Sequence, residues 1–162
     1  MNVDNNKGRW GWAGLLARLA LGSVLIAAGA SKTSAPPEEF AVVIEAYDIV
    51  PVDAAQSLSA LLPWAELLLG FSLVFGFLTP YACLSAAALL AAFLLVLLST
   101  KVRHIQLPNC GCFGTSVHLP TTATMMMDAL LLLATTVAFR HGAAKLSLDG
   151  WATAARHPSC RA

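Results

Sequence analysis

The sequence predicts an all-α membrane protein, built as a bundle of four transmembrane helices with a short amphipathic helix in the first outer loop. The first observation is composition, because 57% of the 162 residues are hydrophobic and 12% are charged. In ordinary globular domains about 45–50% of the residues are apolar and about 25% are charged. The second observation is a set of four apolar runs of spanning length. A formal net charge of +1, without a basic stripe, excludes nucleic acid as a partner.

The four apolar runs cover residues 11–30, 58–78, 81–99 and 123–139. A helix needs about 20 mainly apolar residues to cross a bilayer, with a range of about 17–25. So many apolar runs in so short a chain leave too little polar surface to enclose them in a soluble core. The lipid bilayer is therefore the expected surroundings. We expect residues 1–9 to be disordered, 10–141 to form one membrane domain and 142–162 to form a cytoplasmic tail.

The first run has an alternative interpretation as a secretory signal peptide. Lys7 and Arg9 form a basic start, and the small residues 28–30 resemble a cleavage site. Arg18 interrupts the apolar stretch, however, and this favours a helix that stays in the protein.

Between the first two runs, residues 36–51 predict a short helix rather than a loop. Phe40, Val43, Ile44 and Tyr47 recur at the spacing of one helical face. Pro37 suits the first turn of a helix because that turn needs no backbone N–H donor. We expect this amphipathic helix to lie on the outer face of the bundle.

The distribution of basic residues predicts the orientation. Lys7 and Arg9 precede the first run, and four basic residues follow the last one. The charged residues of segment 31–57 are mostly acidic. The positive-inside rule then places both termini in the cytoplasm of a bacterial inner membrane. Lys101 and Arg103 argue the other way, but the two termini together outweigh them. Segment 31–57 and the cysteine-containing segment before the last run are expected to face the periplasm.

The cysteine-containing segment carries the predicted chemistry, with Cys110 and Cys112 as the catalytic thiols. Disulfides form and persist in an oxidising compartment such as the periplasm. Gly111 lets the backbone adopt the tight conformation that a ring between near neighbours requires. Such a strained disulfide is oxidising and labile, which suits thiol–disulfide exchange. Phe113 and Gly114 are expected to support the motif as a turn and an apolar shield.

A reactive thiol also needs positive potential nearby, which Lys101, Arg103 and His104 can supply. Cys83 and Cys160 fall on the opposite side of the predicted bundle, so we assign them no part in this chemistry. The alternatives are a non-enzymatic membrane scaffold or a metal-binding module. The metal site would use four residues that suit zinc or copper, namely His104, Cys110, Cys112 and His118.

Arg18 and Glu66 stand out as ionisable residues inside the predicted spans. Such residues are costly in a bilayer and usually face the interior of the bundle and pair with one another. Arg18 and Glu66 lie at similar distances from the predicted outer ends of their helices. Two long side chains can close the remaining difference in depth, so we expect an Arg18–Glu66 pair. This pair either fixes the register of two helices or forms a polar site for a quinone headgroup or a proton.

Several motifs resemble a known family. The pattern from Arg18 through Gly22 to Lys32 is similar to the DoxX/MauE group of small bacterial membrane proteins. Tyr47-x3-Pro51, Pro63-x2-Glu66-x3-Gly70 and the Cys110–Gly114 motif resemble the MauE family of methylamine utilisation proteins in particular. The resemblance implies Lys32 and Tyr47 as supporting residues.

The resemblance also implies a four-helix inner-membrane protein that works with a periplasmic thioredoxin-like partner, such as MauD, on disulfide-rich methylamine dehydrogenase. This chain has no Cys-x-x-Cys motif, so that soluble partner must be a separate protein. Its four-span architecture with a dithiol is similar to quinone-linked disulfide-generating enzymes, which makes a membrane quinone the candidate cofactor. Whether the protein is itself an enzyme, a thiol–disulfide oxidoreductase, stays open at this point.

Overall fold

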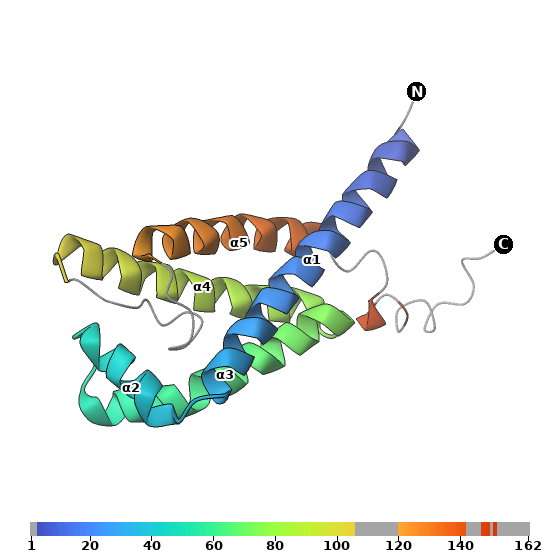
Figure 1. Cartoon of the computed structure of the whole chain (residues 1–162). Helices are drawn as coiled ribbons and strands as arrows, with labels where there is room; N and C mark the ends of the chain where they lie inside the picture. The colour runs from blue at the N-terminus through green and yellow to red at the C-terminus, as the bar shows by residue number, and fades with distance from the viewer. Residues whose placement is uncertain (1–2, 106–119, 142–146, 150, 152–162) are drawn as a thin grey trace.

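The computed structural model describes residues 3–105, 120–141, 147–149 and 151, with side chains from Trp10 onward. Within these ranges the regular secondary structure is helical throughout (Figure 1). The helices are α1 (Val3–Thr33), α2 (Pro37–Ala46), α3 (Val52–Phe75), α4 (Thr79–Val102) and α5 (Thr121–His141).

Four of these helices are long and apolar enough to cross a membrane, and this confirms the predicted fold class. The spans are Trp10–Thr33, Val52–Phe75, Thr79–Val102 and Thr121–His141. The outer faces of the bundle are rich in exposed leucines, and Leu61, Leu68 and Leu95 are 66–68% exposed. An apolar surface of this kind is stable only when lipid covers it. The protein is therefore a multi-pass membrane protein.

Two helix boundaries differ from the sequence prediction. α1 begins at Val3, so the helix includes most of the stretch 1–9 for which disorder was expected. α3 begins at Val52 and continues through Pro63, whereas the apolar run starts only at residue 58. Since hydropathy marks the part of a helix that lies in lipid, it misses turns that extend beyond the lipid. The extra turns of α3 carry α2, which packs against them through Phe40, Ile44 and Ala55.

α1 and α3 run antiparallel and touch backbone to backbone. A Cβ atom added to Gly22 would lie 2.9 Å from the carbonyl oxygen of Gly70, and one added to Gly70 would lie 2.9 Å from the carbonyl oxygen of Gly22. Small residues at such crossings let helices in membranes approach closely. This contact fixes the register, with Gly29 of α1 lying against Pro63 and Leu67 of α3.

The bundle has two ends, which we name by a landmark at each. At the α2 end, α1 finishes, α3 begins, α4 finishes and α5 begins, and Arg103 donates hydrogen bonds to the carbonyl oxygens of Tyr47 (3.3 Å) and Asp48 (3.1 Å). At the Gly76 end, α3 turns sharply into α4. Gly76 has φ 67°, a left-handed conformation that glycine adopts without strain.

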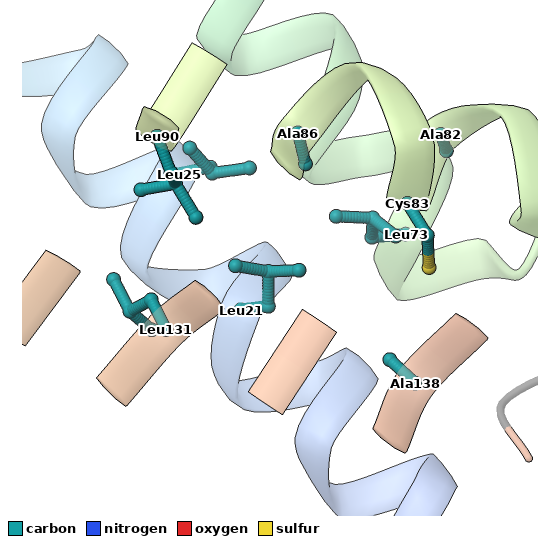
Figure 2. Packing of buried hydrophobic residues seen from close by; sticks show 9 residues of the cluster. All are labelled: Leu21, Leu25, Leu73, Ala82, Cys83, Ala86, Leu90, Leu131 and Ala138. Atoms are coloured by element: carbon teal, nitrogen blue, oxygen red, sulfur yellow. The ribbon is translucent and has the colours of Figure 1, made fainter. Parts of the chain in front are cut away.

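The apolar core lies between α1, α3, α4 and α5 (Figure 2). It contains Leu21, Leu25, Leu73, Ala82, Cys83, Ala86, Leu90, Leu131 and Ala138. Cys83 is fully buried among these side chains with a free thiol. A cysteine in such surroundings behaves as a small apolar residue.

Candidate functional site

A buried ion pair joins α1 to α3 near the α2 end. Lys32 lies in the last turn of α1, and its Nζ atom lies 2.5 Å from Oε1 of Glu66. The two side chains are 1% and 2% exposed. Glu66 is fourteen residues into α3, about 21 Å along the helix axis at 1.5 Å per residue. A carboxylate at this depth needs a partner because neither lipid nor bulk water can solvate its charge there.

Two aromatic rings complete the surroundings of the ammonium group. Nζ of Lys32 lies 5.2 Å from the centre of the Phe40 ring and 5.0 Å from the centre of the Phe93 ring. Rings at this distance attract a cation through their negative faces. Side chains from α1, α2, α3 and α4 therefore meet at one charge. Lys32, expected only as a supporting residue from the family resemblance, is at the centre of the site.

Asp128 of α5 brings a second carboxylate to this region, and the sequence analysis missed it. It is 4% exposed and lines a cavity of about 30 Å³ together with Lys32 and Glu66. The signal was present in the sequence. Asp128 lies inside the apolar run 123–139, so the rule that singled out Glu66 applies to it equally. We call Lys32, Glu66 and Asp128 the buried charge cluster.

Arg18 lies at the other end of the bundle, and the predicted Arg18–Glu66 pair is wrong. A Cβ atom added to Gly76 would lie 2.5 Å from Nη1 of Arg18, which is buried beside the end of α3. The prediction failed because it counted depth from helix ends assumed to be level. α3 begins beyond the end of α1. The register in which Gly22 meets Gly70 therefore places Arg18 closer to the Gly76 end than Glu66 is.

A carboxylate from beyond the last span meets the Gly76 end. Asp149 accepts hydrogen bonds from the backbone N–H groups of Leu78 (3.0 Å) and Thr79 (2.7 Å) at the start of α4. Burial raises the pKa of Asp149, but these hydrogen bonds and the charge of Arg18 outweigh burial and hold the pKa below its ordinary value. The residue thus acts as an N-terminal cap supplied from a distant part of the chain.

An apolar cavity of about 170 Å³ lies at the α2 end, next to the buried charge cluster. Its lining comes from α2, α3, α4 and the segment between α2 and α3, and includes Phe40, Ile44, Tyr47, Leu62 and Phe93. Phe93 and Leu89 line both this cavity and the smaller charged one. An apolar molecule in the larger cavity would therefore lie one side chain away from Lys32.

Comparison with known proteins places this architecture in a family. The family model of the methylamine utilisation protein MauE matches residues 10–140. The chain belongs to the MauE family. One curated relative, the methylamine utilization protein MauE of Paracoccus denitrificans, is 30% identical over 125 residues, which cover 77% of this chain and 67% of the relative. The search of solved structures returned no match.

The MauE match contains the whole buried charge cluster and both cavities, whereas Asp149 lies beyond it. The match also contains the cysteine motif. Cys110, Gly111, Cys112, Phe113, Gly114 and His118 lie outside the described residues, so their roles stay predictions. His104 is described, and it is exposed just after α4 with φ 55°. No cluster of three or more metal-ligating side chains occurs among the residues that the structure describes.

Proposed function

We propose that this MauE-family protein is the membrane component of a thiol–disulfide exchange system in methylamine utilisation. Cys110 and Cys112 cycle between a dithiol and a disulfide and exchange electrons with a thioredoxin-like partner in the periplasm. The observation that carries the proposal is the family match over residues 10–140, a range that includes both thiols. The curated relative is named for methylamine utilisation, and that process is the proposed setting.

The described helices support an outward position for the two thiols. The cysteine segment joins α4, which ends at Val102, to α5, which begins at Thr121, and both of these helix ends are at the α2 end. The exposed surface there carries acidic residues, such as Glu38 and Asp53, whereas α5 finishes at the opposite end with Arg140. The positive-inside rule then favours a periplasmic α2 end and cytoplasmic termini in the inner membrane.

A membrane quinone is the proposed electron carrier on the lipid side. Oxidation of the dithiol by a quinone gives a disulfide and a quinol, so two electrons and two protons pass to the quinone. The apolar cavity of about 170 Å³ supports this step, since binding sites for such molecules are largely apolar with a few polar groups at one side. Reoxidation of the quinol by the respiratory membrane would complete the cycle.

The deciding experiment is thiol trapping in intact cells, with a maleimide that does not cross the inner membrane. The test protein carries Cys83→Ala and Cys160→Ser, so that Cys110 and Cys112 are its cysteines. We expect labelling only after treatment with a reductant, because the pair is oxidised and faces outward. Labelling that appears only after lysis would contradict the periplasmic mechanism.

Growth on methylamine tests whether the thiols perform the function. Cys110→Ser and Cys112→Ser are each expected to abolish growth at an unchanged protein level, whereas Cys83→Ala is the matched control and is expected to keep it. A scaffold would tolerate all three changes. Equal loss of growth in His104→Ala and His118→Ala would instead favour the metal-binding alternative, because thiol exchange does not require His118.

A further inference from the structure

An apolar groove runs between α4 and α5 on the lipid-facing side of the bundle. The two helices lie side by side and antiparallel (Figure 1). The groove has a volume of about 690 Å³, which is larger than the apolar cavity at the α2 end. Its lining includes Leu84, Ala87 and Leu94 of α4 and Ala129, Leu133 and Phe139 of α5. Because Ala87 and Ala129 are small, they leave a hollow among their larger neighbours.

Most of the groove requires no polar ligand. Thr135 and Thr136 also line it, but their hydroxyl groups donate hydrogen bonds to the carbonyl oxygens of Leu131 and Leu133, each at 2.7 Å. These two hydroxyl groups are therefore satisfied within α5. Leu84 and Leu133 are each 65% exposed, so the groove is open to the surrounding lipid. The part of a ligand that lies along it should be a hydrocarbon chain.

One end of the groove carries a positive charge. Arg140 lines it in the last turn of α5, at the Gly76 end. Arg140 is exposed and has no ion-pair partner among the described residues. From Arg140 to Ala129 the lining extends about 16 Å along α5, at 1.5 Å per residue. One leaflet is about 15 Å deep, half of a hydrocarbon core of about 30 Å. The groove thus matches one leaflet in depth, with its charge at the headgroup end.

We propose that the groove between α4 and α5 binds one anionic phospholipid, with an acyl chain along the groove and the phosphate group on Arg140. A guanidinium group can donate two parallel hydrogen bonds to phosphate oxygens. Basic pockets between transmembrane helices recognise anionic headgroups in the same way. The bound lipid would join the last span to α4. The site does not involve the cysteines or the proposed quinone, and it does not depend on which end of the bundle is cytoplasmic.

A second copy of the chain fits this groove less well. Two copies that lie side by side in a membrane with the same orientation have their like ends at the same level. The exposed carboxyl groups among the described side chains lie at the α2 end, namely Glu38, Glu39, Asp48 and Asp53. Asp149 accepts hydrogen bonds at the start of α4. A second copy would therefore bring none of these exposed carboxylates to Arg140, whereas a lipid phosphate supplies the negative charge that it needs.

Native mass spectrometry of the full chain in detergent tests the proposal without any activity assay. The protein is titrated with phosphatidylglycerol, which is anionic, or with phosphatidylcholine, which is zwitterionic, and both lipids carry the same acyl chains. We expect the first phosphatidylglycerol molecule to bind about fivefold more tightly, the usual effect of one basic side chain on an anionic headgroup. Equal binding of the two lipids would overturn the proposal, and this comparison requires no variant to fold.

Arg140→Gln tests whether the headgroup lies at the predicted end of the groove. The variant should bind the two lipids equally, because the acyl chain still has its groove while the charge is gone. Lys101→Gln is the matched control, since Lys101 is an exposed basic residue in the last turn of α4, at the α2 end. It should keep the preference for phosphatidylglycerol. A preference that survives in Arg140→Gln would mean that the headgroup binds elsewhere, and the proposal would be wrong.

Ala129→Phe tests the position of the acyl chain. The new ring should fill the hollow, so the first tight binding event should be lost for both lipids. Leu130→Phe is the matched control, because Leu130 is exposed but does not line the groove, and it should bind lipid as the wild type does. Ala129→Phe with wild-type binding would overturn the proposal. So would a wild-type dimer that Ala129→Phe converts to monomers, since the groove would then belong to a second copy.

Discussion

Two buried cations on one helix meet their partners in different ways. Lys32 and Arg18 both belong to α1, and as whole residues they are 3% and 1% exposed. They lie about 21 Å apart along the helix axis at 1.5 Å per residue. At the α2 end, Lys32 pairs with Glu66 inside a neighbouring span. At the Gly76 end, Arg18 lies beside the turn after α3 and close to Asp149, which lies beyond the last span.

The difference separates two ways of holding a helix bundle together. The α2 end depends on charges that meet within the bilayer, so the removal of one charge leaves the other without compensation. The Gly76 end depends on backbone geometry and on hydrogen bonds to the start of α4. We therefore expect the α2 end to respond most to changes of buried charge, and the Gly76 end to respond most to changes of backbone shape.

The largest effect is expected for Lys32→Met. It leaves Glu66 buried without its cation, and breaking a buried pair in this way costs about 3–5 kcal/mol. The double variant Lys32→Met/Glu66→Gln should recover most of this loss because Glu66 then no longer carries a charge that has lost its partner. The measurement is the free energy of unfolding in detergent micelles, with the exposed Lys101→Met as the control. A Lys32→Met protein as stable as the wild type would show that the ion pair does not stabilise the α2 end.

A smaller loss, about 2–3 kcal/mol, is expected for Gly76→Ala at the opposite end. The left-handed conformation costs an L-residue about 1–2 kcal/mol, and the new Cβ atom would lie 2.5 Å from Arg18 Nη1 and 2.6 Å from Ser147 Cβ. Gly76→Asn separates these two causes, because asparagine tolerates the left-handed conformation and still adds a Cβ atom. If crowding dominates, both variants should lower the melting temperature equally.

The sequence predicted the four spans and α2 because these features depend on local properties, namely hydropathy and helical spacing. The ion pairs depend instead on which residues of two helices lie level with each other. That register is set by the Gly22–Gly70 contact, which hydropathy does not report. Lys32 was therefore not matched with Glu66, and Arg18 was matched with it wrongly.

Two further features of the site could be predicted to different extents. Asp128 was within reach of the sequence analysis, since an acidic residue in an apolar run is a signal in itself. Asp149 was not, because it lies in a short segment without periodicity, and its contact with α4 forms only in the folded chain. The cysteine motif could be recognised from sequence, but it lies outside the described residues, so its chemistry is a matter for the trapping experiment.

Asp149→Asn should cost about 1 kcal/mol, the usual worth of a helix cap, and should also change how stability depends on pH. The folded-state pKa of Asp149 is held below its ordinary value. Its contribution is therefore complete above the unfolded value of about 3.9 and is lost as the pH falls through the folded value. Melting temperatures from neutral to acidic pH should fall less steeply in the variant than in the wild type.

Glu45→Gln, which changes a half-buried carboxyl group of α2, is the control for this pH series. Its acid-side slope measures the effect of losing a carboxyl group that does not cap α4. An Asp149→Asn protein with the wild-type slope would mean that the hydrogen bonds to Leu78 and Thr79 do not stabilise the folded state in solution.

The smallest effect is expected for the second ion pair of the α2 end. Arg103 Nη2 lies 2.5 Å from Asp48 Oδ2, the same distance as in the buried pair, but the two side chains are 41% and 79% exposed. Water screens such a pair, so a double-mutant cycle with Arg103→Met and Asp48→Asn should give a coupling of about 0.2–1 kcal/mol. Salt should weaken this coupling while it spares the one between Lys32 and Glu66. If salt weakened both couplings equally, the buried pair would have to be accessible to solvent, and the contrast between the two kinds of ion pair at this end would no longer hold.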